Sequence, residues 1–401
     1  MATTFKNFLN NDSTNTRTLL HESIPLTGSI VSGTYIADTE LNIKNYAHGM
    51  FQSVYDYPYL SSSANHIFDI TCGFSASSGL SGAAGEGAGK VATQQAKKIN
   101  LYNQMAQMMV GYDPTGSSIR GFDQDGNLAG GSSGLQEVFF LSFARLLSKD
   151  EIKKGSFTIQ VYTGSGCTNG AGPYAVDDGA VSPTGTLTVG DYQATTNYRV
   201  NSPAGEYGIL YTASTTPRDD GLSGVGLIYY QAGIVVLTSS IFSSDPLGIN
   251  SDAPNKSGSV LLGSDGIEAT VAPHGTGSYF GSSDTGSATV WEGFASQSIS
   301  GCADGLRNRL KSISFNNTTE LNSTIYFCRA NHNEFNYSSN PTYLSASKMV
   351  VKNNSTDLPV SYMTTIGLYS ADNELLAMAK LSEPLKKDPN TELTLRVRLD
   401  Y

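Results

Sequence analysis

Residues 362–401 read YMTTIGLYSADNELLAMAKLSEPLKKDPNTELTLRVRLDY, and this stretch decides the fold class. Asp and Asn in the segment 370–373 favour a tight turn between the apolar runs 362–369 and 374–380. The last segment, 393–399, alternates leucine or valine with threonine or arginine, which predicts one buried and one solvated face. The stretch therefore predicts an antiparallel hairpin followed by an amphipathic strand.

The rest of the chain has the composition of a β-rich globular protein. Glycine provides 42 of the 401 residues, more than the usual ~7%, which indicates many turns. The 22 tyrosines and 16 phenylalanines, with only 15% charged residues, exclude a disordered chain. The formal net charge of -10, without long Lys or Arg clusters, argues against a nucleic-acid partner.

From these patterns we expect a mainly β protein with a few helices, of the β-rich α+β class with several antiparallel β domains. The length predicts two to three domains. Changes in composition along the chain suggest a mixed β/helical N-terminal domain over 1–160, a Gly/Asp-rich all-β domain over 161–300 and a C-terminal β domain over 301–401.

Helices are predicted at three places. Apolar residues recur every three or four positions from 91 to 109, and Gly111 follows at the expected cap, which predicts one amphipathic helix near 90–110. The capping box at 148–151 predicts a short helix over 149–154. A further short helix is expected over 303–310.

No segment carries a complete catalytic, cofactor-binding or metal-binding pattern, so we expect a protein that is not an enzyme and needs no cofactor. The glycine-rich loop 82–90 lacks a glycine and a hydroxyl that a phosphate-binding loop requires. The sequence GGSSG at 130–134 follows a turn, whereas a nucleophile elbow follows a strand. Asp123, Asp125 and Asn127 have calcium-loop spacing but lack its glycine and final glutamate. The four cysteines have no zinc-like spacing, so we expect free, mostly buried thiols.

The sequence shows no signal for export or membrane insertion. The first twenty residues contain no apolar core of signal-peptide length. The longest apolar run, 224–242, includes Gln231, three glycines and several hydroxyl side chains, so it predicts two buried strands. We therefore expect a protein of a reducing cytoplasm with no membrane partner.

Five segments carry a resemblance to a known group of proteins: Lys98–Gln107, Ala330–Tyr343, Ile366–Tyr369, Asn373–Lys380 and Glu392–Tyr401. Together they resemble virion structural proteins of contractile-tailed phages, especially marine T-even-like ones. The pair IGLY and NELLAMAK is also similar, more loosely, to the domain by which tail-fibre proteins dock to a baseplate. The matching positions are strand positions, so the resemblance transfers no catalytic residue, and the chain lacks the long repetitive shaft of fibre proteins.

The resemblance implies a non-enzymatic structural subunit of a phage tail or baseplate, present in multiple symmetric copies. Its partners would be other virion structural proteins and copies of itself, and it would be located in the virion after assembly in the host cytoplasm. Two alternatives stay open: a carbohydrate- or receptor-binding module of the tail that uses residues 161–300, and a neck or capsid-decoration protein. Trp291 is the only tryptophan, whereas sugar platforms usually present several aromatic side chains.

Two groups of residues are candidate interface positions, with core packing as the competing interpretation for both. The first is an aromatic block, Tyr46, Phe51, Tyr55, Tyr57 and Tyr59. The second is the terminal strand, Leu393, Leu395, Val397, Leu399 and Tyr401.

Overall fold

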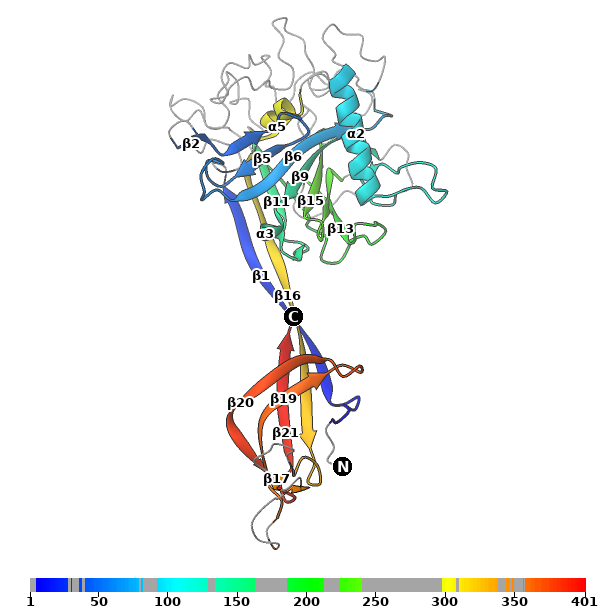
Figure 1. Cartoon of the computed structure of the whole chain (residues 1–401). Helices are drawn as coiled ribbons and strands as arrows, with labels where there is room; N and C mark the ends of the chain where they lie inside the picture. Colours follow the sequence, from blue (N-terminus) through cyan, green and yellow to red (C-terminus); the bar gives the residue numbers. More distant parts are fainter. Residues whose placement is uncertain are drawn as a thin grey trace, which may run out of the picture. The chain divides into compact units, whose positions relative to one another are not determined.

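The computed structural model describes residues 5–27, 30, 36–37, 40–78, 81, 92–128, 134–162, 186–212, 224–239, 298–307, 310–337, 344–345, 348–349, 356 and 358–401. The chain is mainly β with three helices among these residues, which confirms the predicted fold class (Figure 1). The helices are α2 (Ala92–Met109), α3 (Arg145–Ser148) and α5 (Ile299–Arg307).

The chain folds as two compact units. The large unit comprises His21–Thr319, and the terminal unit comprises Met1–Leu20 together with Glu320–Tyr401. This division differs from the three domains expected over 1–160, 161–300 and 301–401.

Pairing between distant strands explains the difference. β11 (Thr158–Tyr162) pairs with β12 (Thr186–Gly190) on one side and with β16 (Leu310–Ala330) on the other, so three predicted domains share one sheet. Much of the expected middle domain, including Trp291 and the segments 163–185, 213–223 and 240–297, lies outside the described residues.

Seven antiparallel strands form the main sheet of the large unit, in the order β13-β14-β15-β9-β6-β5-β4. β9 reads EVFFLSF and is buried at every position except Ser142, because both faces of the sheet are covered. The bounds are β4 (Ile43–Asn45), β5 (Gln52–Tyr55), β6 (His66–Phe74), β9 (Glu137–Phe143), β13 (Tyr207–Leu210), β14 (Gly226–Tyr229) and β15 (Ile234–Thr238).

One face of this sheet packs against a second sheet, which contains β11, β12, β10 (Glu151–Ile152) and the adjoining parts of β16 and β1 (Ser13–Thr27). The ring of Phe143 lies 4.8 Å from that of Phe315 and 6.2 Å from that of Phe157, measured between centroids. The core of the large unit therefore joins strands that are far apart in the sequence.

Helix α2 packs on the main sheet along β6 (Figure 1), as its apolar repeat predicted. Gly111 ends the helix at φ +82°, and its N–H donates to the carbonyl of Ala106 at 2.9 Å, which confirms the predicted glycine cap. The helix approaches the sheet closely at Gly73 of β6. A Cβ atom there would lie 2.7 Å from the carbonyl oxygen of Lys98.

The substitution Gly73→Ala is expected to destabilise the large unit by about 1–3 kcal/mol, because the added methyl group would overpack the contact with the backbone of α2. Denaturant unfolding followed by circular dichroism measures the loss. A larger loss for Gly73→Val than for Gly73→Ala would identify crowding as the cause, and unchanged midpoints for both variants would contradict it.

The predicted helix over 149–154 is wrong. Helix α3 ends at Ser148, Lys149 adopts φ +51°, and the next residues form β10, which pairs with β16. Ile152 is completely buried, and its N–H donates to the carbonyl of Tyr230 at 3.0 Å. Burial and strand pairing thus outweigh the local capping signal. The helix expected over 303–310 exists, but it begins four residues earlier, as α5.

The terminal unit contains a sheet of three strands, in which β16 lies between β1 and β21 (Leu393–Asp400). The predicted hairpin is present as β19 (Ser361–Tyr369) and β20 (Leu375–Lys387), and Figure 1 shows it beside β21. Asn373 adopts φ +63° in the turn, and the N–H of Ser370 donates to the carbonyl of Glu374 at 2.9 Å. Both the hairpin and the alternation of the last strand confirm the sequence-based predictions.

The described residues also form three short ladders of two strands each. They are β2 (Ile36–Ala37) with β3 (Glu40–Leu41), β7 (Phe122–Asp123) with β8 (Gly134–Leu135), and β17 (Leu344–Ser345) with β18 (Lys348–Met349).

Candidate interaction surfaces

The candidate positions on the terminal strand contribute mainly to the packing of their own unit. β21 pairs with β16 from Ser323 to Ala330, and Val397 is buried. The other three aliphatic candidates, Leu393, Leu395 and Leu399, are half-buried. Tyr401 is 73% exposed, so it is the candidate of this group that solvent reaches most.

The aromatic block lies in the large unit, where Tyr55 ends β5 and the other four residues lie in the connections before and after this strand. Tyr57 is exposed and the other four candidates are half-buried. Their rings form two clusters: Tyr46 with His48 and Phe51, at centroid distances of 4.9–5.1 Å, and Tyr55 with Tyr59 and His66, at 6.2 and 5.6 Å. The structure thus places the ring of Tyr46 against that of Phe51, and the ring of Tyr55 against that of Tyr59.

Sequence reasoning did not single out a polar group beside this block. The carboxylate of Asp69 on β6 accepts a hydrogen bond from Ser53 Oγ at 2.5 Å and lies 2.8 Å from His66 Nε2. Burial, together with a hydrogen bond to Tyr46, raises the pKa of Tyr55 to about 12. Because Ser53 donates to the carboxylate rather than to the imidazole, this group lacks the serine–histidine contact that activates a nucleophile.

A cavity of about 540 Å³ lies in the terminal unit, and we call it the β19 groove. Eight of the nine residues of β19 line it, from both faces of the strand, whereas no residue of β20 does. The groove therefore runs along the edge of β19 that faces away from β20. Its aromatic lining comprises Phe5, Phe8, Phe327, Phe335, Tyr337, Tyr362 and Tyr369.

The charged side chains that line the β19 groove are paired. Lys6 Nζ lies 2.5 Å from Glu334 Oε2, and Arg329 forms an ion pair with Asp12. The hydrogen bond from Lys6 lowers the pKa of Glu334, while the N–H of Leu9 and the guanidinium of Arg329 lower the pKa of Asp12. The groove thus has a mixed polar and aromatic lining in which the charges are compensated.

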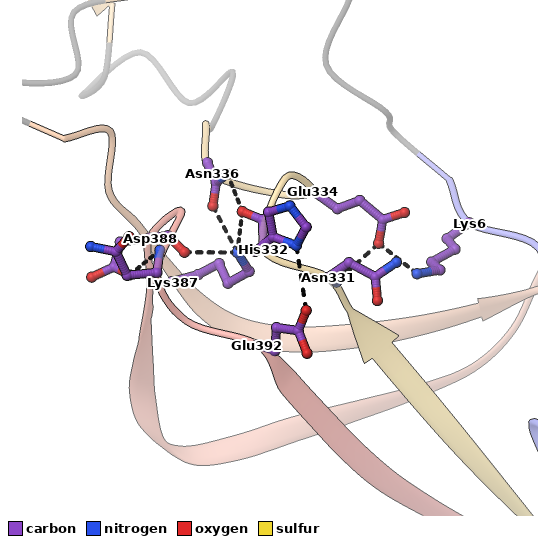
Figure 2. A network of polar contacts seen from close by, with 9 residues as sticks. Lys6, Asn331, His332, Glu334, Asn336, Lys387, Asp388 and Glu392 are labelled. Carbon is purple, nitrogen blue, oxygen red and sulfur yellow. Dashed lines mark hydrogen bonds and ion pairs between the residues drawn. The ribbon is translucent and has the colours of Figure 1, made fainter.

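Lys387 anchors the open end of the hairpin (Figure 2). Its side chain is completely buried, and Nζ donates to Asn336 Oδ1 at 2.7 Å, to the carbonyl of Asp388 at 3.0 Å and to that of His332 at 3.2 Å. Burial lowers the pKa of Lys387. The imidazole of His332 is exposed, 3.4 Å from Glu392, so this residue contributes to the network chiefly through its carbonyl group.

Acid is expected to weaken the terminal unit. Hydrogen bonds and ion pairs lower the pKa of Asp12, Glu334, Asp388 and Asp400, so their stabilisation is present above about pH 4. It is lost as the pH falls through the lower pKa values of the folded state. Thermal melting over a pH series, with hydrogen exchange of residues 320–337 and 358–401, measures this loss. Glu334→Gln should flatten the dependence, and a terminal unit whose protection does not change with acid would contradict the expectation.

The described residues hold no group of three His, Cys, Asp or Glu side chains that could bind a metal ion. Cys72 and Cys302 are buried thiols and Cys328 is a half-buried thiol, as predicted for the cysteines that the structure describes. Among the described residues, no helix is long and apolar enough to cross a membrane.

No family model matches the chain, and neither the curated proteins nor the solved structures include one that is similar to it.

Proposed function

We propose that the chain is a non-enzymatic structural subunit of a tailed-phage virion, a tail or baseplate component that assembles in multiple symmetric copies. The distribution of exposed apolar side chains carries the proposal. Among the residues that the structure describes, 21 large hydrophobic side chains are exposed, and 14 of them belong to the terminal unit, which holds about a third of these residues. Large exposed apolar patches on proteins mark sites of interaction with other proteins.

The segments that resemble virion proteins support the same proposal. Ile366–Tyr369 belongs to β19, Asn373–Lys380 spans the turn and the start of β20, and Glu392–Tyr401 includes β21. All three lie in the unit with the exposed apolar surface. The partners are then other virion structural proteins and further copies of this chain, and the location is the virion after assembly in the host cytoplasm.

Mass spectrometry of purified phage particles, dissociated into heads and tails, tests the proposal. We expect the chain in the tail fraction, in a fixed ratio to the other tail proteins. Recovery with heads alone would favour a neck or capsid-decoration protein, and absence from particles would overturn the proposal. Binding of the full chain to a glycan array would favour a carbohydrate-binding module instead.

A further inference from the structure

The terminal unit is electrically neutral, whereas the large unit carries the charge of the whole chain. The terminal unit contains ten Lys and Arg residues and ten Asp and Glu residues, so the net charge of -10 comes from residues 21–319. Two copies of a neutral unit do not repel each other, and a net charge near zero promotes association. A second copy of this chain is therefore electrostatically compatible with the terminal unit.

The β19 groove offers backbone groups for an additional strand. Among the described strands, β19 pairs only with β20, and the groove runs along the opposite edge of β19. A strand edge with unpaired N–H and C=O groups is a template for another strand, and neighbouring apolar pockets accept its side chains. The paired charges in the groove favour an uncharged strand over a charged ligand.

β20 presents a strand of this kind at its start. Leu375–Ala379 reads LLAMA and carries no charge, while Leu376 is 69% exposed and Met378 is 66% exposed. Within the described residues, β20 pairs with β19 alone, so its other edge has no partner strand. Each copy thus provides both an accepting edge and a donating edge. Contacts between two different surfaces of identical chains generate a ring when the rotation closes.

We infer that the β19 groove accepts the β20 segment Leu375–Ala379 of a second copy of this chain, so that copies join by strand addition through their terminal units. The inference deepens the proposed function, since it gives the mode of contact for the multiple copies. It also stands apart from that function, because its evidence is the groove, the neutral unit and the exposed segment.

A pair of matched double variants tests the inference in the full-length chain. Leu376→Lys with Met378→Lys places two charges on the donating segment. Because both side chains are exposed, the substitutions should change the stability of the single chain little. Leu60→Lys with Met108→Lys is the control, because these side chains are 68% and 61% exposed but belong to the large unit.

Sedimentation velocity over a range of protein concentrations measures the mass of each form. We expect multimers for the unaltered chain and for the control, and a monomer for Leu376→Lys with Met378→Lys. Equal masses for the two double variants would overturn the inference, as would an unaltered chain that stays monomeric at every concentration.

Thiol labelling gives a second readout that does not depend on mass. Cys328 lines the groove and is half-buried, so a strand added by a second copy would cover it. A maleimide should therefore label Cys328 more slowly in the unaltered chain than in the Leu376→Lys, Met378→Lys variant, at equal melting temperatures. Equal labelling rates would contradict strand addition in the groove.

The outcomes separate the inference from the proposed function. If the chain is found in tails but keeps its mass after the two substitutions, the proposed function stands and the inference is overturned. If the chain forms multimers through Leu376 and Met378 but is absent from phage particles, the inference stands and the proposed function is overturned.

Discussion

Removal of Thr391–Tyr401 is expected to unfold the terminal unit and to leave the large unit folded. β21 supplies eight registered residue pairs with β16, and it buries Val397 and half-buries three leucines. A ladder hydrogen bond contributes about 0.5–1.5 kcal/mol, and a fully buried aliphatic side chain about 1.5–3 kcal/mol. Their combined loss is comparable to the ~5–15 kcal/mol that stabilises a typical domain.

Hydrogen exchange of the truncated and complete chains measures this effect by segment. Amides of β19 and β20 should lose their protection, whereas those of β9 and β14 in the large unit should keep it. Thr394→Ala is the control, because Thr394 lies on the exposed face of β21 and its replacement leaves the buried face intact. A truncated chain with protected β19 amides would show that the terminal strand is dispensable.

The substitution Lys387→Ala is expected to destabilise the terminal unit by about 2–4 kcal/mol. It removes the donor of three hydrogen bonds and leaves the carbonyl groups of His332 and Asp388 and the amide oxygen of Asn336 without it. Hydrogen bonds from charged donors contribute about 1.5–3 kcal/mol each, and unsatisfied buried acceptors add a cost. The cost of burying the ammonium group, which lowers its pKa, offsets part of this gain.

The neighbouring Lys386 provides a matched control. Its side chain is exposed and forms an ion pair of 3.3 Å with Asp388, so Lys386→Ala should change stability by less than about 1 kcal/mol. Denaturant unfolding, with hydrogen exchange of the terminal unit, compares the two variants. Equal losses for both lysines would show that the buried network does not stabilise the hairpin.

Elements with complete local signals could be predicted from the sequence. The Asp-Asn turn lies between two apolar runs, and the 3-4 repeat of α2 ends at a glycine, so neighbouring residues alone specify these elements. The burial pattern of 393–399 follows from strict alternation in the same way. In each case, the residues that decide the structure lie within one element or beside it.

Features that depend on distant residues could not be predicted. β16 spans 21 residues, but its polar centre, 316–322, resembles a loop until its partner strands are known. Ile152 forms a strand because β16 lies beside it, against the helix signal of its own neighbours. The β19 groove also combines residues 5–12 with residues 327–395, and no pattern in either segment indicates the other.

The order of residues in the terminal unit has a consequence for the timing of its formation in the cell. This unit combines the start of the described chain with residues from 320 onward, whereas the large unit is continuous in sequence. At about 5–20 residues per second, β21 leaves the ribosome several seconds after the last residue of the large unit. Residues 5–12 are therefore synthesised long before the residues 327–395 with which they form the β19 groove. A chain still on the ribosome has no complete groove with which to bind other copies. Translation itself would then delay association until the subunit is ready.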